Sequence, residues 1–159
     1  MSKNIITVVG ARPQLIKASA VSRSLEAKES LQEYLVHTGQ HFDDNMSGVF
    51  FRELGLSAPD AFLGIHGGGH GDMTGRMLIE LEALLLKKNP DLVLVYGDTN
   101  STLAGALAAA KLGIPVGHVE AGLRSFNRQM PEELNRVITD HVSDFLFAPT
   151  TIAVENLSR

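Results

Sequence analysis

The sequence has no cysteine among its 159 residues, and this absence removes several classes of chemistry at once. A chain without cysteine forms no disulfide, offers no thiolate to a metal ion and has no thiol nucleophile. It also lacks an excess of basic residues: 14 lysines and arginines stand against 18 acids, a formal net charge of −4. Because a nucleic-acid-binding protein needs a basic surface, this balance argues against a nucleic-acid partner.

Long apolar runs are missing as well. No stretch approaches the roughly 20 apolar residues that a membrane-spanning helix needs, and no signal-peptide pattern precedes the first apolar run at residues 4–9. We therefore expect a cytoplasmic protein that does not bind membranes. The dinucleotide-binding pattern G-x-G-x-x-G is absent too, so a nicotinamide cofactor is a poor interpretation, and no cofactor is expected.

What the sequence does contain is a regular alternation of short β-rich apolar runs and longer helical stretches. The expected strands are residues 4–9, 33–39, 60–65, 91–97, 114–119 and 145–149. The expected helices are residues 13–27, 43–55, 71–89, 100–113 and 131–144, with a short one after residue 149. This pattern predicts an α/β fold, a Rossmann-like doubly wound parallel sheet with helices on both faces, and one domain over residues 1–159.

In sheets of this kind, ligands bind beyond the carboxyl ends of the strands. Four loops follow strands and should share that edge: residues 10–12, 38–41, 97–99 and 117–136. In the first loop a glycine turn leads into a helix with Arg12 and Lys17 near its start, which favours an anion such as phosphate. The alternative is a basic residue at an ordinary turn, and the residues alone leave both open.

The third loop places Asp98 at the end of the most apolar strand. An acid there suits a general acid or base, although aspartate also caps helices well. Thr99 and Asn100 could cap the same helix, which favours a functional role for Asp98. In the second loop, Gln40 and His41 could hydrogen-bond a ligand, but a lone histidine is more often plain surface.

The fourth loop is dense in charge. Glu120 follows a buried strand directly and has no helix behind it to explain an acid, whereas Glu132 and Glu133 lie in the first turn of a helix, where acids complement the helix dipole. His118 precedes Glu120 by two residues, so strand alternation puts both side chains on one face. Paired acids at metal-ligand spacing are not found near the histidines, so no metal site is expected.

Five stretches together resemble the N-terminal half of the non-hydrolysing UDP-N-acetylglucosamine 2-epimerases. They are VVGARPQLIK (8–17), HTGQHFDDNMSGVFF (37–51), HGDMTGRMLIE (70–80), the run from DLVLVYGDTN to HVEAGLRSF (91–126) and MPEELNRVITDHVSD (130–144). The resemblance implies two Rossmann-like domains in the glycosyltransferase-B arrangement, with the active site between them. It also implies interconversion of UDP-N-acetylglucosamine and UDP-N-acetylmannosamine by elimination of UDP and its re-addition with inversion at C2.

The same resemblance assigns residues. It implies that Asp98, Glu120 and Glu132 form the acid/base set, and it leaves Glu133 to the helix dipole. Positions that it implies for substrate binding are Arg12, Lys17, Gln40, His41 and Arg136. Gln40 and His41, together with Arg76, also match positions associated in bacterial members with a second, regulatory UDP-sugar.

Departures from the family pattern bear on the substrate. Ala11 and Gln14 replace a hydroxyl and an acid of the common GTRPE motif. The stretches GARPQ, TGQHFD and SFNRQMPEE lean toward the branch that includes epimerases of UDP-2,3-diacetamido-2,3-dideoxyglucuronate, which is the alternative substrate. A glycosyltransferase of the same architecture is a further reading, disfavoured by three acids without a metal motif.

The family's second domain, with its uridine contacts and a catalytic histidine, has no counterpart in these 159 residues. We therefore expect the isolated chain to be inactive, and a non-catalytic binding or oligomerisation module is the alternative of another class. The full-length enzyme is expected to be a homodimer. An apolar helix face is one candidate dimer surface, with packing on the domain's own sheet as the favoured interpretation for most of its residues: Met77, Leu78, Leu81, Leu84 and Leu85.

Overall fold

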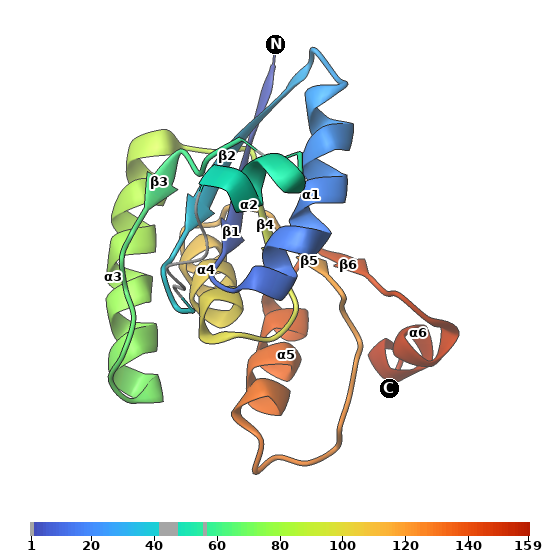
Figure 1. Cartoon of the computed structure of the whole chain (residues 1–159). Coiled ribbons are helices and arrows are strands. Elements are labelled where there is room, and N and C mark those ends of the chain that lie inside the picture. Colours follow the sequence, from blue (N-terminus) through green and yellow to red (C-terminus); the bar gives the residue numbers. More distant parts are fainter. Residues whose placement is uncertain (1, 42–47, 56) are drawn as a thin grey trace.

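The computed structural model describes residues 2–41, 48–55 and 57–159 (Figure 1). Its centre is a parallel sheet of six strands in the order β3-β2-β1-β4-β5-β6. The strands are β1 (Lys3–Val9), β2 (Leu31–His37), β3 (Ala61–Phe62), β4 (Leu92–Tyr96), β5 (Val116–Val119) and β6 (Phe145–Phe147). This is the strand order of the doubly wound α/β fold, so the predicted fold class is confirmed.

In the described part of the chain, five helices connect the strands and a sixth, α6, follows β6. They are α1 (Arg12–Glu26), α2 (Gly48–Glu53), α3 (His70–Lys88), α4 (Asn100–Lys111), α5 (Pro131–Val142) and α6 (Thr151–Leu157). Helices α1 and α2 pack on one face of the sheet, and α3 and α4 pack on the other with α5 beside α4 (Figure 1). Right-handed crossovers between parallel strands produce this division, which leaves all strand carboxyl ends at one edge.

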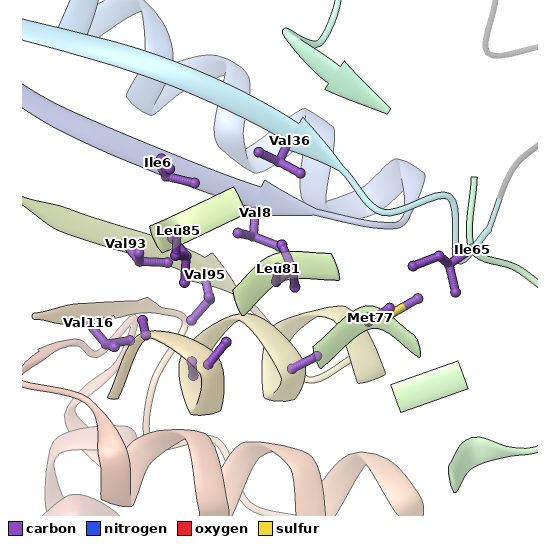
Figure 2. Close-up of a cluster of buried hydrophobic side chains, with 14 residues drawn as sticks. Ile6, Val8, Val36, Ile65, Met77, Leu81, Leu85, Val93, Val95 and Val116 are labelled. Carbon is purple, nitrogen blue, oxygen red and sulfur yellow. The ribbon is translucent and has the colours of Figure 1, made fainter. Parts of the chain in front are cut away.

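The core explains why the strands read as continuous apolar runs. One cluster joins Ile6, Val8, Val93 and Val95 to the inner sides of α3 and α4 (Figure 2). A second cluster on the opposite face joins alternate residues of the same strands to Leu15 and Ala18 of α1. Because both faces are covered, successive residues of β1 and β4 are buried, which is typical of parallel sheets.

Helix α3 packs its apolar side on this domain's own sheet. Met77, Leu81 and Leu85 are fully buried, and Leu78 and Leu84 are partly buried against the same cluster. The favoured interpretation of this face is therefore confirmed, and the five residues do not form an exposed surface. The expected homodimer stays a prediction.

Most observed element boundaries lie within one or two residues of the predicted ones, and β3 and α2 differ more. Strand β2 begins at Leu31 rather than residue 33, and β3 contains two residues rather than six. The helix predicted for residues 43–55 is observed as α2, Gly48–Glu53, and residues 43–47 of that prediction lie outside the described residues. The strand ends that precede the candidate site residues agree with the prediction at β1 and β5 and within one residue at β4.

Candidate active site

The loop after β4 places Asp98 between a strand end and a helix start. Thr99, not Asp98, caps helix α4, because the Thr99 hydroxyl accepts a hydrogen bond from the Thr102 N–H. The Asp98 carboxylate instead accepts a hydrogen bond from Arg136 Nη2 at 2.5 Å. The interpretation of Asp98 as a helix cap is thereby excluded, and its side chain remains partly exposed at the rim.

Glu120 lies one residue beyond β5 and has a left-handed backbone, with φ of 76°. Its carboxylate forms an ion pair with Lys17 of α1, whereas the His118 imidazole points to Asp140 of α5. The prediction that His118 and Glu120 share one face is therefore wrong. Strand alternation ends at Val119, and the positive φ turns the Glu120 side chain toward the opposite side of the sheet.

Asp98 and Glu120 follow two adjacent strands, β4 and β5, at this edge. A Cβ atom added to Gly97 would lie 3.5 Å from Glu120 Oε2, so the Glu120 carboxylate lies beside the residue that precedes Asp98. Each of these two acids is paired with a cation from a different helix, Lys17 from α1 and Arg136 from α5. The structure thus brings four predicted site residues together around the ends of β4 and β5.

Helix α5 contributes two adjacent acids with different surroundings. Glu133 is 3% exposed, and its carboxylate accepts hydrogen bonds from the Ser125 N–H at 2.8 Å, the Phe126 N–H at 3.1 Å and Arg136 Nη1 at 2.9 Å. Burial alone would raise the Glu133 pKa, but these hydrogen bonds and the Arg136 charge outweigh it and hold the pKa below its ordinary value. Glu133 therefore does more than complement the helix dipole: it fixes Arg136 and the loop before α5.

Glu132 is exposed, and its carboxylate makes no hydrogen bond within the described part of the chain. Glu132 lies in the first turn of α5, and Arg136 lies one turn further along the same helix. The side chain is thus available to a ligand, and its assignment to the acid/base set stays a prediction.

The loop after β1, residues 10–12, lies close to α4 and to the residue that follows β2. A Cβ atom at Gly10 would lie 2.0 Å from Ser101 Oγ and 2.4 Å from Thr38 Oγ1, so only glycine fits there. The glycine is required here because the loop passes close to Ser101 of α4 and to Thr38 after β2. Arg12 is the first residue of α1 and is exposed, and Lys17 lies further along the same helix.

Gln40 and His41 are held against this loop. Gln40 Oε1 accepts hydrogen bonds from the Ser101 N–H at 2.9 Å and the Ser101 hydroxyl at 2.7 Å, and the His41 N–H donates to the Gly10 carbonyl at 2.8 Å. Gln40 thus closes the N-terminus of α4, which gives it a structural role beside the predicted ligand role.

Arg76 lies apart from the other predicted residues. Its guanidinium pairs with Asp72 at 2.7 Å and donates to the His66 and Gly67 carbonyls at 3.3 and 2.9 Å. These contacts fix the loop before α3, which contains His66 and Gly67, to that helix. They do not reach Asp98 or Glu120. The predicted regulatory role of Arg76 remains a prediction.

Two groups of residues at this edge were not assigned by sequence reasoning. Gln14 is buried, accepts from the Gly10 and Ala11 N–H groups, and donates to the Tyr96 carbonyl at 2.6 Å. His118 and Asp140 form a buried pair. The partners of these buried residues come from distant parts of the chain, so spacing in the sequence does not reveal them.

The described residues contain no cluster of three or more His, Cys, Asp or Glu side chains arranged to hold a metal ion. In the same residues we find no helix with the length and hydropathy required to cross a membrane. The edge carries carboxylates paired with cations, Glu120 with Lys17 and Asp98 with Arg136. Such groups suit proton transfer together with binding of an anionic ligand.

Comparison with known proteins places these features in a family. Residues 23–159 match the model of the family described as UDP-N-acetylglucosamine 2-epimerase. The chain is 63% identical over 155 residues to the UDP-2,3-diacetamido-2,3-dideoxy-D-glucuronate 2-epimerase of Pseudomonas aeruginosa, covering 98% of this chain and 44% of the relative. It is 59% identical over 152 residues to the UDP-N-acetylglucosamine 2-epimerase of Methanococcus maripaludis, covering 96% of this chain and 41% of the relative.

A solved structure agrees with the fold. The UDP-GlcNAc 2-epimerase of Methanocaldococcus jannaschii, in complex with UDP-GlcNAc and UDP, superposes with a TM-score of 0.92 at 55% identity, over 100% of this chain and 43% of that one. The chain spans less than half the length of the curated relatives that it matches. The family that the sequence motifs predicted is confirmed: this chain belongs to the UDP-N-acetylglucosamine 2-epimerase family.

Proposed function

We propose that this chain is the catalytic N-terminal domain of a UDP-N-acetylglucosamine 2-epimerase, with Asp98, Glu120 and Glu132 as its acid/base groups. The observation that carries the proposal is that two carboxylates following adjacent strands, Asp98 and Glu120, pair with Arg136 and Lys17. The relatives named above are epimerases of UDP-sugars, and one is solved with UDP-GlcNAc bound.

Inversion at C2 of such a sugar requires a proton to leave one face and another to arrive on the opposite face. When a carboxylate removes the C2 proton, the C–H electron pair forms the C1–C2 double bond, and the C1–O pair leaves with UDP. Re-addition reverses these steps with a proton delivered to the other face. Acids in different surroundings suit the two roles, because their environments separate their proton affinities.

The cations suit the leaving group. Lys17 and Arg136 lie beside the two acids, and a diphosphate bound there would take over part of their charge. Arg12, at the first position of α1, adds a guanidinium that fits a phosphate oxygen pair. Nearby positive charge stabilises the negative charge that builds on the β-phosphate as the C1–O bond breaks.

We propose further that a second domain, of the length that the relatives have beyond this match, completes the site. Two observations support this: the chain covers only 41–44% of the curated relatives, and the rim acids are open to solvent. The isolated chain is accordingly expected to bind UDP-sugars weakly and to turn none over.

The second candidate substrate is UDP-2,3-diacetamido-2,3-dideoxyglucuronate, favoured by the 63% identity to the Pseudomonas aeruginosa relative. Two chimeras separate the substrates. This chain replaces the matched segment either of that relative or of the Methanococcus maripaludis relative. If this chain determines which UDP-sugar is accepted, both chimeras prefer the same UDP-sugar. If instead each chimera prefers the substrate of the relative that supplies its second domain, the second domain determines the substrate.

The acid/base assignment is tested in whichever chimera is active. Asp98→Asn and Glu120→Gln are each expected to lower kcat by about 100-fold or more and to change KM little, because general acid/base groups contribute on that scale. Glu82→Gln, an exposed acid on α3, serves as the matched control with unchanged kcat. Wild-type turnover in either rim variant would remove that residue from the acid/base set, and two inactive chimeras would contradict the proposed function.

A further inference from the structure

A buried ion pair lies directly behind the rim and outside the assigned acid/base groups. His118 Nδ1 lies 2.6 Å from Asp140 Oδ1, and the two side chains are 0% and 3% exposed. His118 belongs to β5 and Asp140 to α5, one helical turn beyond Arg136. The pair therefore joins the two elements that carry Glu120 and Arg136.

The second ring nitrogen of His118 also faces an acceptor. Nε2 lies 2.7 Å from the Gly97 carbonyl oxygen, which can only accept a hydrogen bond. Both contacts are satisfied together when the imidazole carries a proton on each nitrogen and Asp140 is a carboxylate. Burial alone would raise the Asp140 pKa, but hydrogen bonds from His118 and Arg124 hold it below its ordinary value, which favours the carboxylate form of Asp140 that accepts both hydrogen bonds.

The other Asp140 oxygen extends the network to the turn behind Glu120. Asp140 Oδ2 accepts hydrogen bonds from the Gly122 N–H at 3.1 Å and from Arg124 Nη1 at 2.6 Å. Gly122 follows Glu120 by two residues. The network thus ends at two backbone groups. One is the Gly122 N–H, two residues after Glu120, and the other is the Gly97 carbonyl, directly before Asp98.

These backbone contacts lie where the pairing of strands β4 and β5 ends. The Gly97 N–H donates to the Val119 carbonyl at 3.0 Å as the β4–β5 pairing ends. The Gly97 carbonyl shares a planar peptide unit with the nitrogen and Cα of Asp98, so a hydrogen bond to that carbonyl fixes the direction in which Asp98 leaves the strand.

Stability alone is a poor explanation for such a pair. Removing two charges from water costs about as much as their attraction returns, so apolar residues of the same volume often serve as well. We propose that His118 and Asp140 are positioning residues that hold the Asp98 and Glu120 backbones at the separation the two-faced proton transfer requires. This inference rests on the proposed function of the same site.

Two single-residue variants separate the contacts of His118 in an active chimera. His118→Gln retains a donor at the Nε2 position for the Gly97 carbonyl, whereas His118→Asn retains a donor only at the Nδ1 position for Asp140. Because a misplacement of about 1 Å can lower turnover by about 100-fold, we expect kcat at least about tenfold lower for Asn than for Gln, with KM changed by less than about threefold in both.

The outcomes are distinguishable. Thermal midpoints show whether both variants fold; if they do and their kcat values are equal, the positioning role is overturned. If the unsubstituted chimera is inactive, the proposed function fails instead.

A measurement on the unchanged 159-residue chain is independent of turnover. Proton NMR of the His118 ring is expected to show an Nδ1–H signal shifted strongly downfield by its hydrogen bond to Asp140. Absence of that hydrogen bond would contradict the network on which the inference rests, including in the case that neither variant folds.

Discussion

Glu120 has a backbone conformation that most residues avoid. At φ of 76° it lies in the left-handed region, where a side chain with a Cβ atom is strained by about 1 kcal/mol or more. Two other non-glycine residues, Asn89 and Phe126, share a positive φ in the described part of the chain, and Asn89 closes helix α3. At Glu120 the conformation turns the carboxylate out of the strand and toward Lys17.

This strain predicts an unusual order of stability. Glu120→Gly should unfold with a free energy about 1 kcal/mol higher than Glu120→Ala, because both lose the carboxylate and only glycine is unstrained at this φ. Ala83→Gly, at an exposed position within α3, is the control and should lower stability by about 1 kcal/mol. Urea denaturation measures both, and equal stability of the Gly and Ala variants at position 120 would show that the site stores no strain.

His37 is a second residue whose surroundings set a measurable property. Its ring is buried and stacked on Phe62 with centroids 5.4 Å apart, and Nδ1 accepts a hydrogen bond from the Gly39 N–H at 3.0 Å. Burial lowers the His37 pKa from 6.5 to about 4. The folded chain therefore keeps this ring neutral under conditions in which the unfolded chain protonates it.

The sign of the linkage gives a pH prediction. The contribution of neutral His37 to stability is complete above pH 6.5 and is lost as pH falls from 6.5 toward 4, because only the unfolded state then takes up the proton. His37→Asn keeps an acceptor for Gly39 but does not titrate. Its stability should fall less than that of the wild type across this window in urea titrations, and parallel curves would contradict the buried neutral state.

At the residue scale, sequence patterns located the acids but not their directions. Asp98 and Glu120 could be found because an acid at the end of an apolar strand has few structural explanations. The side to which Glu120 points depends on one backbone dihedral angle, which no residue pattern reveals. Glu132 and Glu133 are adjacent in one helical turn, so the orientation of α5 decides that Glu133 is buried.

At the scale of elements, Gln14 joins the two βα units of the site. Its side chain accepts from the Gly10 and Ala11 N–H groups at 2.7 and 3.1 Å and donates to the Tyr96 carbonyl and the Thr99 hydroxyl at 2.6 and 2.9 Å. An amide is suited to this position because it accepts and donates at once. The carboxylate found in the common family motif has no donor when ionised.

Replacement of Gln14 tests whether its hydrogen bonds hold the two βα units together. Gln14→Met keeps the approximate volume but leaves backbone groups of the β1–α1 and β4–α4 loops without partners, so we expect a loss of about 3 kcal/mol in the free energy of unfolding. Gln32→Met on β2, at an exposed position, should change it by less than about 0.5 kcal/mol. Similar losses for both variants would show that the Gln14 network does not hold the loops together.

The elements themselves were largely predictable. Strands buried on both faces read as continuous apolar runs, and glycine or proline marks most helix ends, so the order and type of the elements followed from the sequence. The short β3 was overextended to residues 60–65 because an apolar run does not show how many of its residues find a pairing partner. The Gln14 and His118 networks depend on side chains from distant elements, which spacing along the chain cannot bring together.

At the scale of the whole molecule, this chain supplies one side of a site. The predicted site residues other than Arg76 lie at or beside the carboxyl edge of one sheet. Helix α5 and the loop before it extend beyond that edge (Figure 1). The relatives are more than twice as long as the matched segment. An open edge of acids and cations is consistent with a site completed by a facing domain, as proposed above.

The most direct test of the central claim is the fate of the C2 hydrogen. An active chimera that carries this chain is incubated with its UDP-sugar in heavy water, and the products are analysed by proton NMR. If strand-end carboxylates remove and return a proton at C2, the epimer carries deuterium at C2, and Asp98→Asn or Glu120→Gln slows its appearance. An epimer that retains its original C2 hydrogen would contradict proton transfer at this site.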